Sequence, residues 1–453
     1  MIYAQTHDYD RQLRTHSLEG VWGSAVAHQD ILLAALRYSS VSEAHLFCED
    51  PSANQQPNQA IFELETEFGP GCVQRFPLTD LRRRSESAEY IFVIDVNCLQ
   101  QLYQFRQQIR RNAFPGCGIL HAIGWSLANT SYMLAFSLSE TYDSLVVTSQ
   151  AGLQAMKELL DEAFSFLSWR YKRPLRPRLH MEHIPLGVDL DFLQPIEKMA
   201  AKRLLGLFEE DIVVLYLGRM TDEFKADLEP LLTAFSRSAA GRQRLRLLLA
   251  GGTNGLDYPA RLQEASNSLG IGDRVSFVAD FQIFAKPVIL SSADIFVSPV
   301  DNVQETFGIS ILEAMAAGLP VIASDWSGYR DLVVDGETGF LIPTFWESGA
   351  ARRISPVMPL CCNYSAEHYL AQRTPVDVDA LTARLNLLAD EPELRRRMGE
   401  CGMERVRERF SWPVVMRRYD ELWRQQWLTL SRSAEPPAFR LNFSDIYRSF
   451  ASC

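Results

Sequence analysis

Short apolar runs alternate with longer stretches of helical periodicity along most of the chain. Runs such as residues 90–94 (YIFVI) and 212–217 (IVVLYL) hold only aliphatic and aromatic side chains, which is typical of strands buried on both faces of a sheet. Elsewhere apolar side chains recur at helical spacing, as at Leu32 and Leu36 within residues 24–37, which predicts amphipathic helices. The alternation predicts an α/β architecture of parallel sheets covered by helices.

Two such series follow one another, and residues 185–195 (PLGVDLDFLQP) lie between them as a stretch with glycine and two prolines. We therefore expect two Rossmann-like, doubly wound domains, residues 1–197 and residues 198–411, followed by a helix and tail, residues 412–453. Mixed sequence at residues 345–373 predicts an inserted surface segment. The predicted strands are residues 2–5, 44–48, 90–94, 118–121, 144–148, 183–185, 212–217, 245–250, 275–277, 295–298 and 320–323, and the helices singled out are residues 24–37, 151–166, 310–317 and 412–428.

Composition and charge narrow the class of protein. Hydrophobic residues make up 47% of the chain and charged residues 22%, which fits a globular protein with large cores. The formal net charge of -11 argues against a nucleic-acid partner, because a phosphate backbone attracts a basic face. The eight cysteines form no CxxC pair, which favours reduced thiols. We expect neither a structural metal nor a cofactor.

The sequence also bears on location. It holds no run of about 18 apolar residues and no basic-then-apolar start, so we expect a cytoplasmic protein without a spanning helix. The basic stretch at residues 169–178 (WRYKRPLRPR) is expected to be solvated surface. Contact with anionic lipid at the inner face of a membrane, or with a phosphorylated ligand, is the alternative.

The strongest chemical signal is residues 304–324 (QETFGISILEAMAAGLPVIAS). Glu305, Phe307 and Gly308 precede a predicted helix, whose free N–H groups and dipole attract an anion such as a diphosphate. Glu313 follows within that helix, where a carboxylate can accept hydrogen bonds from both hydroxyls of a ribose. Taken alone, two glutamates at this spacing are more often solvated side chains beside a core helix, so the surrounding segments decide between the two interpretations.

Those segments resemble the nucleotide-sugar domain of the family 4 glycosyltransferases, retaining enzymes with the GT-B fold. The matching stretches are residues 217–225 (LGRMTDEFK), 250–252 (AGG), 333–343 (VVDGETGFLIP, a closing Gly-rich loop) and 183–189 (HIPLGVD, a linker). The chain departs from the family where residues 324–333 (SDWSGYRDLV) replace a Gly-Gly-then-Glu pattern. The resemblance implies two domains that face each other across a cleft, with the C-terminal helix crossing back to the first.

The resemblance also implies roles for particular residues. Arg219 and Lys225 are expected to bind the donor diphosphate, which makes a metal dispensable. Glu305 and His121 are the expected catalytic residues, at the sugar and its departing phosphate. Gly20 and Gly23 are expected to form an acceptor-side loop before the first helix, whereas a simple turn is the plain alternative for them.

The implied function is retaining transfer of a sugar from a nucleotide diphosphate-sugar to a hydroxyl or similar acceptor, which is a glycan, lipid, small molecule or protein. An inactive nucleotide-sugar-binding or assembly protein of the same fold is the alternative. Asp301 and Gln304, beside the first glutamate, are expected near the sugar hydroxyls but outside the core set. His28 is expected to be an ordinary structural histidine.

Overall fold

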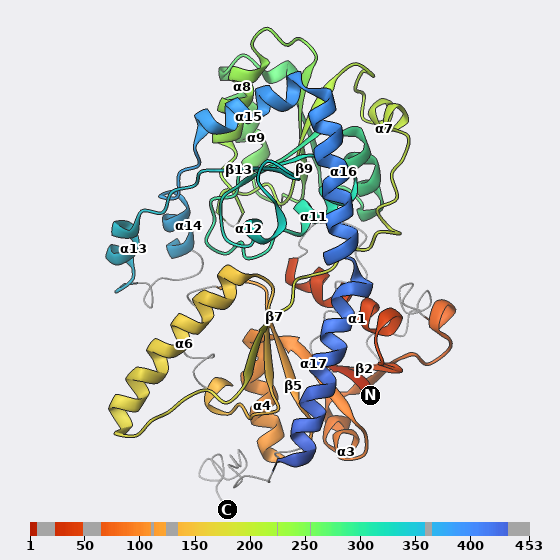
Figure 1. Cartoon of the computed structure of the whole chain (residues 1–453), viewed down its shortest axis with the longest axis vertical. Helices are drawn as coiled ribbons and strands as arrows, with labels where there is room; N and C mark the ends of the chain where they lie inside the picture. The colour runs from red at the N-terminus through yellow and green to blue at the C-terminus, as the bar shows by residue number, and fades with distance from the viewer. Residues whose placement is uncertain are drawn as a thin grey trace, which may run out of the picture.

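The chain forms two all-parallel sheets, one above the other along the long axis of the molecule, with helices around each (Figure 1). This computed structural model describes residues 1–6, 23–48, 65–109, 113–123, 135–223, 225–253, 255–357 and 365–433. We call the halves built on the two sheets the first and second domains, and the boundary at 197/198 remains our proposal. The predicted α/β architecture is confirmed.

The first sheet has the strand order β3-β2-β1-β4-β5-β6-β7, so the direction of winding reverses between β1 and β4. Its strands are β1 (Ile2–Gln5), β2 (Glu43–Cys48), β3 (Val73–Pro77), β4 (Tyr90–Asp95), β5 (Gly116–Leu120), β6 (Ser144–Val147) and β7 (His180–His183). The prediction missed β3 and placed the last strand at 183–185, three residues late. Both are edge strands with half-exposed polar residues, so neither shows a continuous apolar run.

The second sheet has the order β10-β9-β8-β11-β12-β13 and reverses between β8 and β11. Its strands are β8 (Ile212–Leu217), β9 (Leu245–Gly251), β10 (Val275–Ala279), β11 (Ile295–Ser298), β12 (Val321–Ser324) and β13 (Gly339–Ile342). The prediction assigned β13 to a closing loop. Instead it pairs with β12, and a side chain at Gly339 would overlap the carbonyl of Val321.

Helices pack on the sheets of both domains (Figure 1). Those of the first domain are α1 (Gly23–Tyr38), α3 (Leu81–Ser85), α4 (Leu99–Gln108) and α6 (Gln150–Tyr171). Those of the second are α7 (Lys198–Leu204), α8 (Glu229–Ala239), α9 (Tyr258–Ser268), α10 (Lys286–Ser292), α11 (Ile309–Ala316), α12 (Tyr329–Leu332), α13 (Ser348–Ile354), α14 (Ser365–Ala371), α15 (Val378–Asp390) and α16 (Pro392–Arg409). The helix predicted at 151–166 extends to residue 171, and α13 and α14 lie within 345–373. No helix in the described part of the chain is long and apolar enough to cross a bilayer.

The last described helix, α17 (Trp412–Arg432), leaves the second domain and packs along α1 of the first (Figure 1). Its Trp423 is fully buried, with its ring centroid 6.2 Å from that of Tyr3 in β1. Gln426 donates to the carbonyls of Gly116 (2.9 Å) and Tyr142 (3.1 Å). One buried apolar cluster therefore runs from the α1 face of the first sheet into the second domain, while a separate cluster fills the opposite face of that sheet.

Candidate active site

The carboxyl ends of the two sheets meet at the candidate site. His121 directly follows β5, and its carbonyl accepts a hydrogen bond from Thr306 Oγ1 in the loop between β11 and α11. Ligands of doubly wound sheets bind at the carboxyl ends of the strands. The region between the two domains where His121 and Thr306 meet is therefore the candidate substrate site.

Glu305 lies beside that contact and is held by two cations from the loop after β8. Lys225 Nζ forms an ion pair with Glu305 Oε2, and the N–H of Phe307 donates to Oε1 at 3.2 Å. Burial alone would raise the pKa of Glu305, but the charge and hydrogen bond of Lys225, together with the charge of Arg219, hold it below the usual glutamate value. Glu305 is therefore ionised at neutral pH, within a small cluster of opposite charges.

Gly308 stands at the start of α11 for a conformational reason. Its φ of 99° is one that side-chain-bearing residues rarely adopt, and a Cβ there would overlap the ring of Tyr329. The Tyr329 ring is fully buried, and its hydroxyl hydrogen-bonds to Ser298 Oγ at 2.9 Å. The glycine thus lets a buried tyrosine support the loop that carries Glu305, in addition to the ligand access expected from the sequence.

Glu313, in α11, is 9% exposed and pairs with Lys286 at the start of α10, Nζ to Oε1 2.7 Å. Lys286 and Glu313 also interact electrostatically with Asp30, which lies on α1 of the first domain. The pKa of Asp30 is raised to about 7, chiefly by burial; the charge of Lys286 opposes this shift, and the charges of Glu313 and Asp189 add to it. A charged cluster therefore connects Glu313, the carboxylate that the sequence predicts at a ribose, to the opposite domain.

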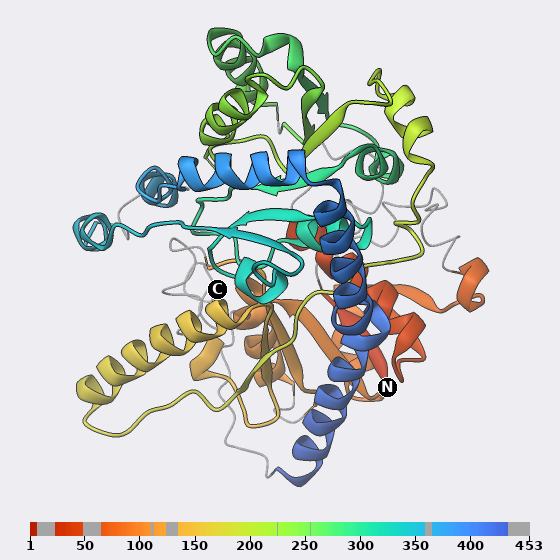
Figure 2. The same cartoon turned by 45° about the horizontal axis from the view of Figure 1, so that its top comes forward.

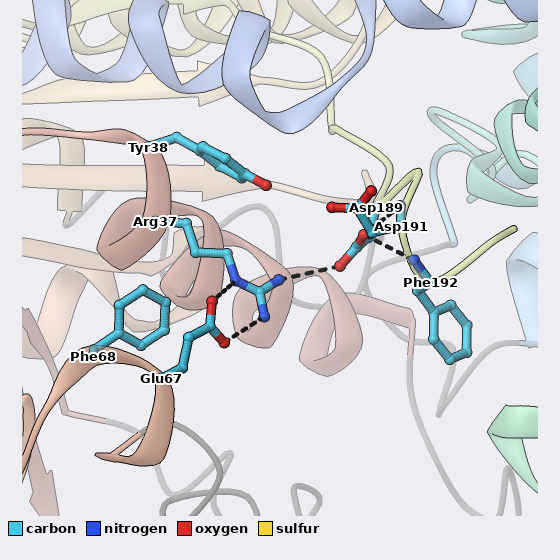
Figure 3. Close-up of a pocket in the computed structure, with 7 residues that line it drawn as sticks. All are labelled: Arg37, Tyr38, Glu67, Phe68, Asp189, Asp191 and Phe192. Atoms are coloured by element: carbon cyan, nitrogen blue, oxygen red, sulfur yellow. Dashed lines mark hydrogen bonds and ion pairs between the residues drawn. The ribbon is translucent and has the colours of Figure 1, made fainter.

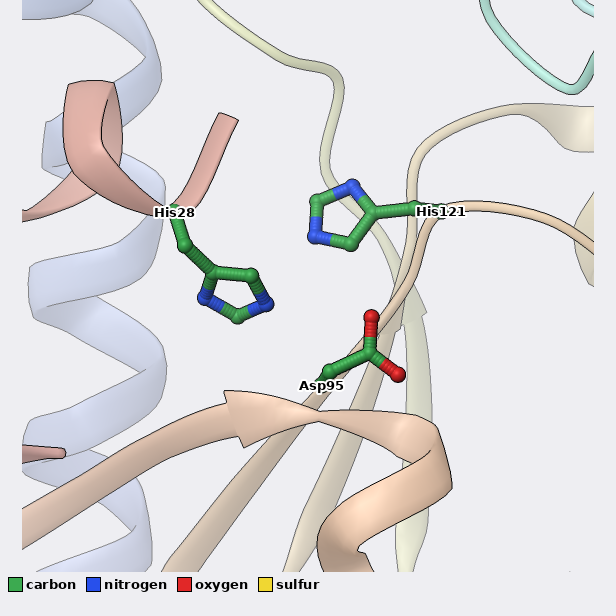
Figure 4. Close-up of side chains that lie close together, drawn as sticks. All are labelled: His28, Asp95 and His121. Atoms are coloured by element: carbon green, nitrogen blue, oxygen red, sulfur yellow. The ribbon is translucent and has the colours of Figure 1, made fainter. Parts of the chain in front are cut away.

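His121 faces two other polar side chains of the first domain (Figure 4). The rings of His28, on α1, and His121 are 4.8 Å apart, edge to face, and Asp95 ends β4 beside them. Burial lowers the pKa of His121 despite the opposing charge of Asp95, so the imidazole is neutral at pH 7. His121 Nε2 is buried and has no hydrogen-bond partner within the described residues, so it is the unsatisfied polar atom of this group.

The group of His28, Asp95 and His121 is also where the described chain could hold a cation, since their ligand atoms lie within 4.8 Å of one another. Two imidazoles and a carboxylate are donors that transition metals accept. Asp95 Oδ1 already accepts two hydrogen bonds from Asn97, which fix the carboxylate.

Asp301 and Gln304 flank the same loop. Asp301 is buried and Oδ1 accepts from the N–H of Asp227 at 3.3 Å, while burial, followed by nearby acidic charge, raises its pKa to about 8. Gln304 Nε2 is buried without a hydrogen-bond partner among the described residues. Between them, the fully buried Asn302 anchors the loop through Glu223 O and Gln304 N.

The structure brings most of the predicted residues together. Glu305, Phe307 and Gly308 share one loop with Lys225 and Arg219 at its side, Glu313 follows in α11, and His121 faces the loop from the other domain. Gly23 is the first residue of α1, and Gly20 lies outside the described residues.

Sequence reasoning missed several residues of the site. An acidic residue at the carboxyl end of a strand was an available signal for Asp95. Thr306 lay inside the recognised motif, and His28 was taken for a structural residue. Lys286 gives no local signal, because its contact with Glu313 spans 27 residues.

A pocket of about 630 Å³ lies elsewhere, between the end of α1 and the linker that follows β7 (Figure 3). Its lining includes Arg37, which pairs with Glu67 (Nε to Oε1 2.7 Å) and Asp189 (Nη1 to Oδ2 3.2 Å). Because Glu67 and Asp189 already neutralise Arg37, this pocket offers no free positive charge to a diphosphate and is not a candidate for its binding site.

Comparisons with known proteins find relatives of part of the chain and of its fold. Residues 198–358 match the model of the glycosyl transferases group 1 family. A D-inositol 3-phosphate glycosyltransferase of Geodermatophilus obscurus is 36% identical over 165 residues, 35% of this chain and 36% of that protein. The D-inositol 3-phosphate glycosyltransferase of Mycobacterium tuberculosis is 30% identical over 257 residues, which are 54% of this chain and 49% of that protein. The matched stretches thus span half or less of these relatives.

Two solved structures share the fold over nearly the whole chain. Sucrose-phosphate synthase of Thermosynechococcus elongatus has a TM-score of 0.62 and 21% identity, covering 95% of this chain and 100% of that one. Anabaena HepE, in complex with UDP and glucose, has a TM-score of 0.64 and 16% identity, covering 94% and 100%. At these identities the likeness concerns the fold, and it confirms the predicted GT-B architecture. Residues 198–358 therefore match the group 1 glycosyl transferases, and the chain as a whole has the two-sheet GT-B fold.

Proposed function

We propose that the protein is a retaining glycosyltransferase that moves a sugar from a nucleotide diphosphate-sugar to a hydroxyl acceptor without a metal. The observation that carries the proposal is the charge cluster at the carboxyl end of the second sheet, where Glu305 of the loop before α11 meets Lys225 and Arg219 of the loop after β8. A diphosphate placed at the N-terminus of α11 finds free N–H groups and both cations. Fixed positive charge there stabilises the leaving group as its negative charge grows.

In this proposal the donor replaces the internal partners of the two glutamates. Lys225 turns from Glu305 to the phosphates, which frees the Glu305 carboxylate for sugar hydroxyls. Glu313 gives up its ion pair with Lys286 and accepts hydrogen bonds from the ribose hydroxyls instead. Each buried carboxylate thereby keeps a partner throughout, which avoids the cost of an unpaired buried charge.

The bond between the anomeric carbon and the diphosphate oxygen breaks, and the acceptor oxygen bonds to the same face of that carbon. The acceptor proton passes to the departing phosphate oxygen, so no protein nucleophile is required. His121, neutral and with Nε2 unpartnered, is placed to hold the sugar or its departing oxygen by a hydrogen bond. Gly20 and Gly23 remain the proposed acceptor-side loop.

The test is a screen of purified protein with UDP-, GDP-, ADP- and dTDP-sugars, scored by mass detection of released nucleoside diphosphate. UDP-glucose is the first donor to try, since HepE is a protein of this fold seen with UDP and glucose. Glu305→Gln and Arg219→Ala should each lower kcat/KM by about a hundredfold or more. Glu264→Gln and Arg397→Ala, exposed side chains on α9 and α16, are the matched controls.

Normal turnover by a folded Glu305→Gln or Arg219→Ala protein would show that the site is misassigned. The alternative function, an inactive nucleotide-sugar-binding protein, has a different signature. It requires saturable donor binding with no release of nucleoside diphosphate across a broad acceptor panel.

A further inference from the structure

We infer that the far end of α6 and the segment after it, residues 166–178, form a docking surface for an anionic membrane. This inference does not rest on the proposed transferase activity, and the experiment that tests it measures only membrane binding. We call these residues the α6 tip.

The α6 tip extends beyond the body of the molecule. Figures 1 and 2 show α6 running outward from the junction of the two domains, with its far end clear of both sheets. The helix has 22 residues and is therefore about 33 Å long. Its last buried residue is Phe164, so the final two turns are not covered by the fold.

Large aromatic side chains lie exposed on those uncovered turns. Phe166 is 57% exposed, Trp169 63% and Tyr171 65%. The rings of Phe166 and Trp169 are 5.9 Å apart, so they form one cluster. Trp and Tyr favour the boundary between hydrocarbon and water, because each combines an apolar ring with a polar atom.

The same tip is strongly basic in a chain with a net charge of -11. Residues 169–178 contain five Arg and Lys residues and no acidic residue. Arg178 is engaged with Glu140 at 2.8 Å, but no ion pair within the described residues holds the other four, which are Arg170, Lys172, Arg173 and Arg176. This local charge is complementary to an anionic lipid surface and opposite to that of the protein as a whole.

The tip is already ordered, which lowers the entropic cost of docking. Lys172 ends the helix with a φ of 55°, and its ammonium lies 5.1 Å from the Trp169 ring centroid. Ser168 Oγ accepts from the N–H of Leu175 at 2.8 Å and ties the returning segment to the helix. Exposed aromatics beside unpaired cations supply the two signals, apolar and electrostatic, that stable peripheral binding requires.

The experiment is co-sedimentation of the full chain with phosphatidylcholine vesicles and with vesicles that also contain phosphatidylglycerol. We expect binding to the anionic vesicles that weakens with salt. The variant Arg170→Gln/Arg173→Gln/Arg176→Gln should weaken it at least about tenfold, since each cation near the surface adds attraction. Trp169→Ala/Tyr171→Ala should weaken it comparably, through loss of apolar contact.

The matched controls alter exposed residues elsewhere, namely Arg82→Gln/Arg83→Gln/Arg397→Gln and Phe284→Ala, and should bind as the wild type does. The inference is overturned if anionic vesicles are not preferred, or if both tip variants bind as strongly as the wild type. Capture of a protein partner by the tip without vesicle binding would overturn it as well. Donor turnover measured without vesicles should be equal in all these variants, which separates this test from that of the proposed function.

Discussion

Each of the two glutamates in the recognised motif is held by a lysine that lies far away along the chain. Lys225 is 80 residues from Glu305, and Lys286 is 27 residues from Glu313. The glutamates and Gly308 were predictable, because the motif is contiguous and helix starts have a known chemistry. Lys286 and Asp30 were not, because their roles arise only when α10, α11 and α1 come together.

Gly308 is expected to be intolerant of any side chain. Gly308→Ala combines an unfavourable φ with an overlap on the buried Tyr329 ring, so it should cost about 2 kcal/mol or more of unfolding free energy. Gly336→Ala is the control, since its φ of 78° is also positive but a Cβ there meets nothing within 4 Å. It should cost about 1 kcal/mol. Equal losses in urea unfolding would contradict the role assigned to Tyr329.

Asp301 should make stability depend on pH in an unusual direction. Burial raises its folded-state pKa to about 8, so between about pH 4 and pH 8 the folded chain keeps a proton that the unfolded chain has lost. Its contribution to the unfolding free energy therefore decreases as pH rises through that window, by up to about 1.4 kcal/mol per pH unit. Thermal or urea unfolding from pH 5 to pH 8 should show Asp301→Asn losing stability less steeply than the wild type. Parallel pH profiles would show that Asp301 is ionised in the folded chain.

Among the elements, the central strands and long helices were predicted well, since buried parallel strands give unbroken apolar runs. The misplaced elements have two causes. β3 and β7 are edge strands of mixed polarity, and the last turn of α6 exposes its aromatics, so these segments do not follow the burial pattern that the prediction relies on. β13 is buried, but it is short and begins at a glycine, so its sequence resembles that of a loop.

The helix α17 should contribute strongly to stability through one face. Trp423→Ala removes a fully buried indole packed beside Tyr3 and Tyr419, and should cost about 3–5 kcal/mol of unfolding free energy. Leu428→Ala, on the same helix at a residue 45% exposed, should change it by no more than about 0.5 kcal/mol. Calorimetry of the two variants measures both. A mild loss at Trp423 would mean that α17 is only loosely docked.

At the scale of the whole molecule, two hydrogen bonds between described residues join the two domains at the candidate site. Thr306 Oγ1 donates to the carbonyl of His121, and the N–H of Gln150, at the start of α6, donates to Asp331 Oδ2 at 2.7 Å. Asp331 belongs to the segment where the sequence departs from the family pattern. The departure was visible in the sequence, but its consequence, a contact with the other domain, depends on how the domains face each other.

Removing one of these contacts should open the molecule. Thr306→Val deletes the hydrogen bond to His121, whose net worth of about 0.5–1.5 kcal/mol corresponds to a roughly two- to tenfold shift toward open forms. Small-angle X-ray scattering should show a larger radius of gyration and kinetics a lower kcat/KM. Thr338→Val, which removes a hydrogen bond to the N–H of Val334 within the second domain, is the control and should leave the radius unchanged. Identical scattering from both variants would assign domain closure to other contacts.

The path of α17 has a consequence for how the protein is made. Trp423 packs against Tyr3, so Tyr3 meets this neighbour only after 420 further residues have been added to the chain. At about 5–20 residues per second, that interval is on the order of half a minute or more. During it the α1 side of the first domain lacks α17 while the second domain is synthesised. Release of an incomplete chain would leave that apolar side exposed, so premature termination anywhere before residue 412 should yield an aggregation-prone product.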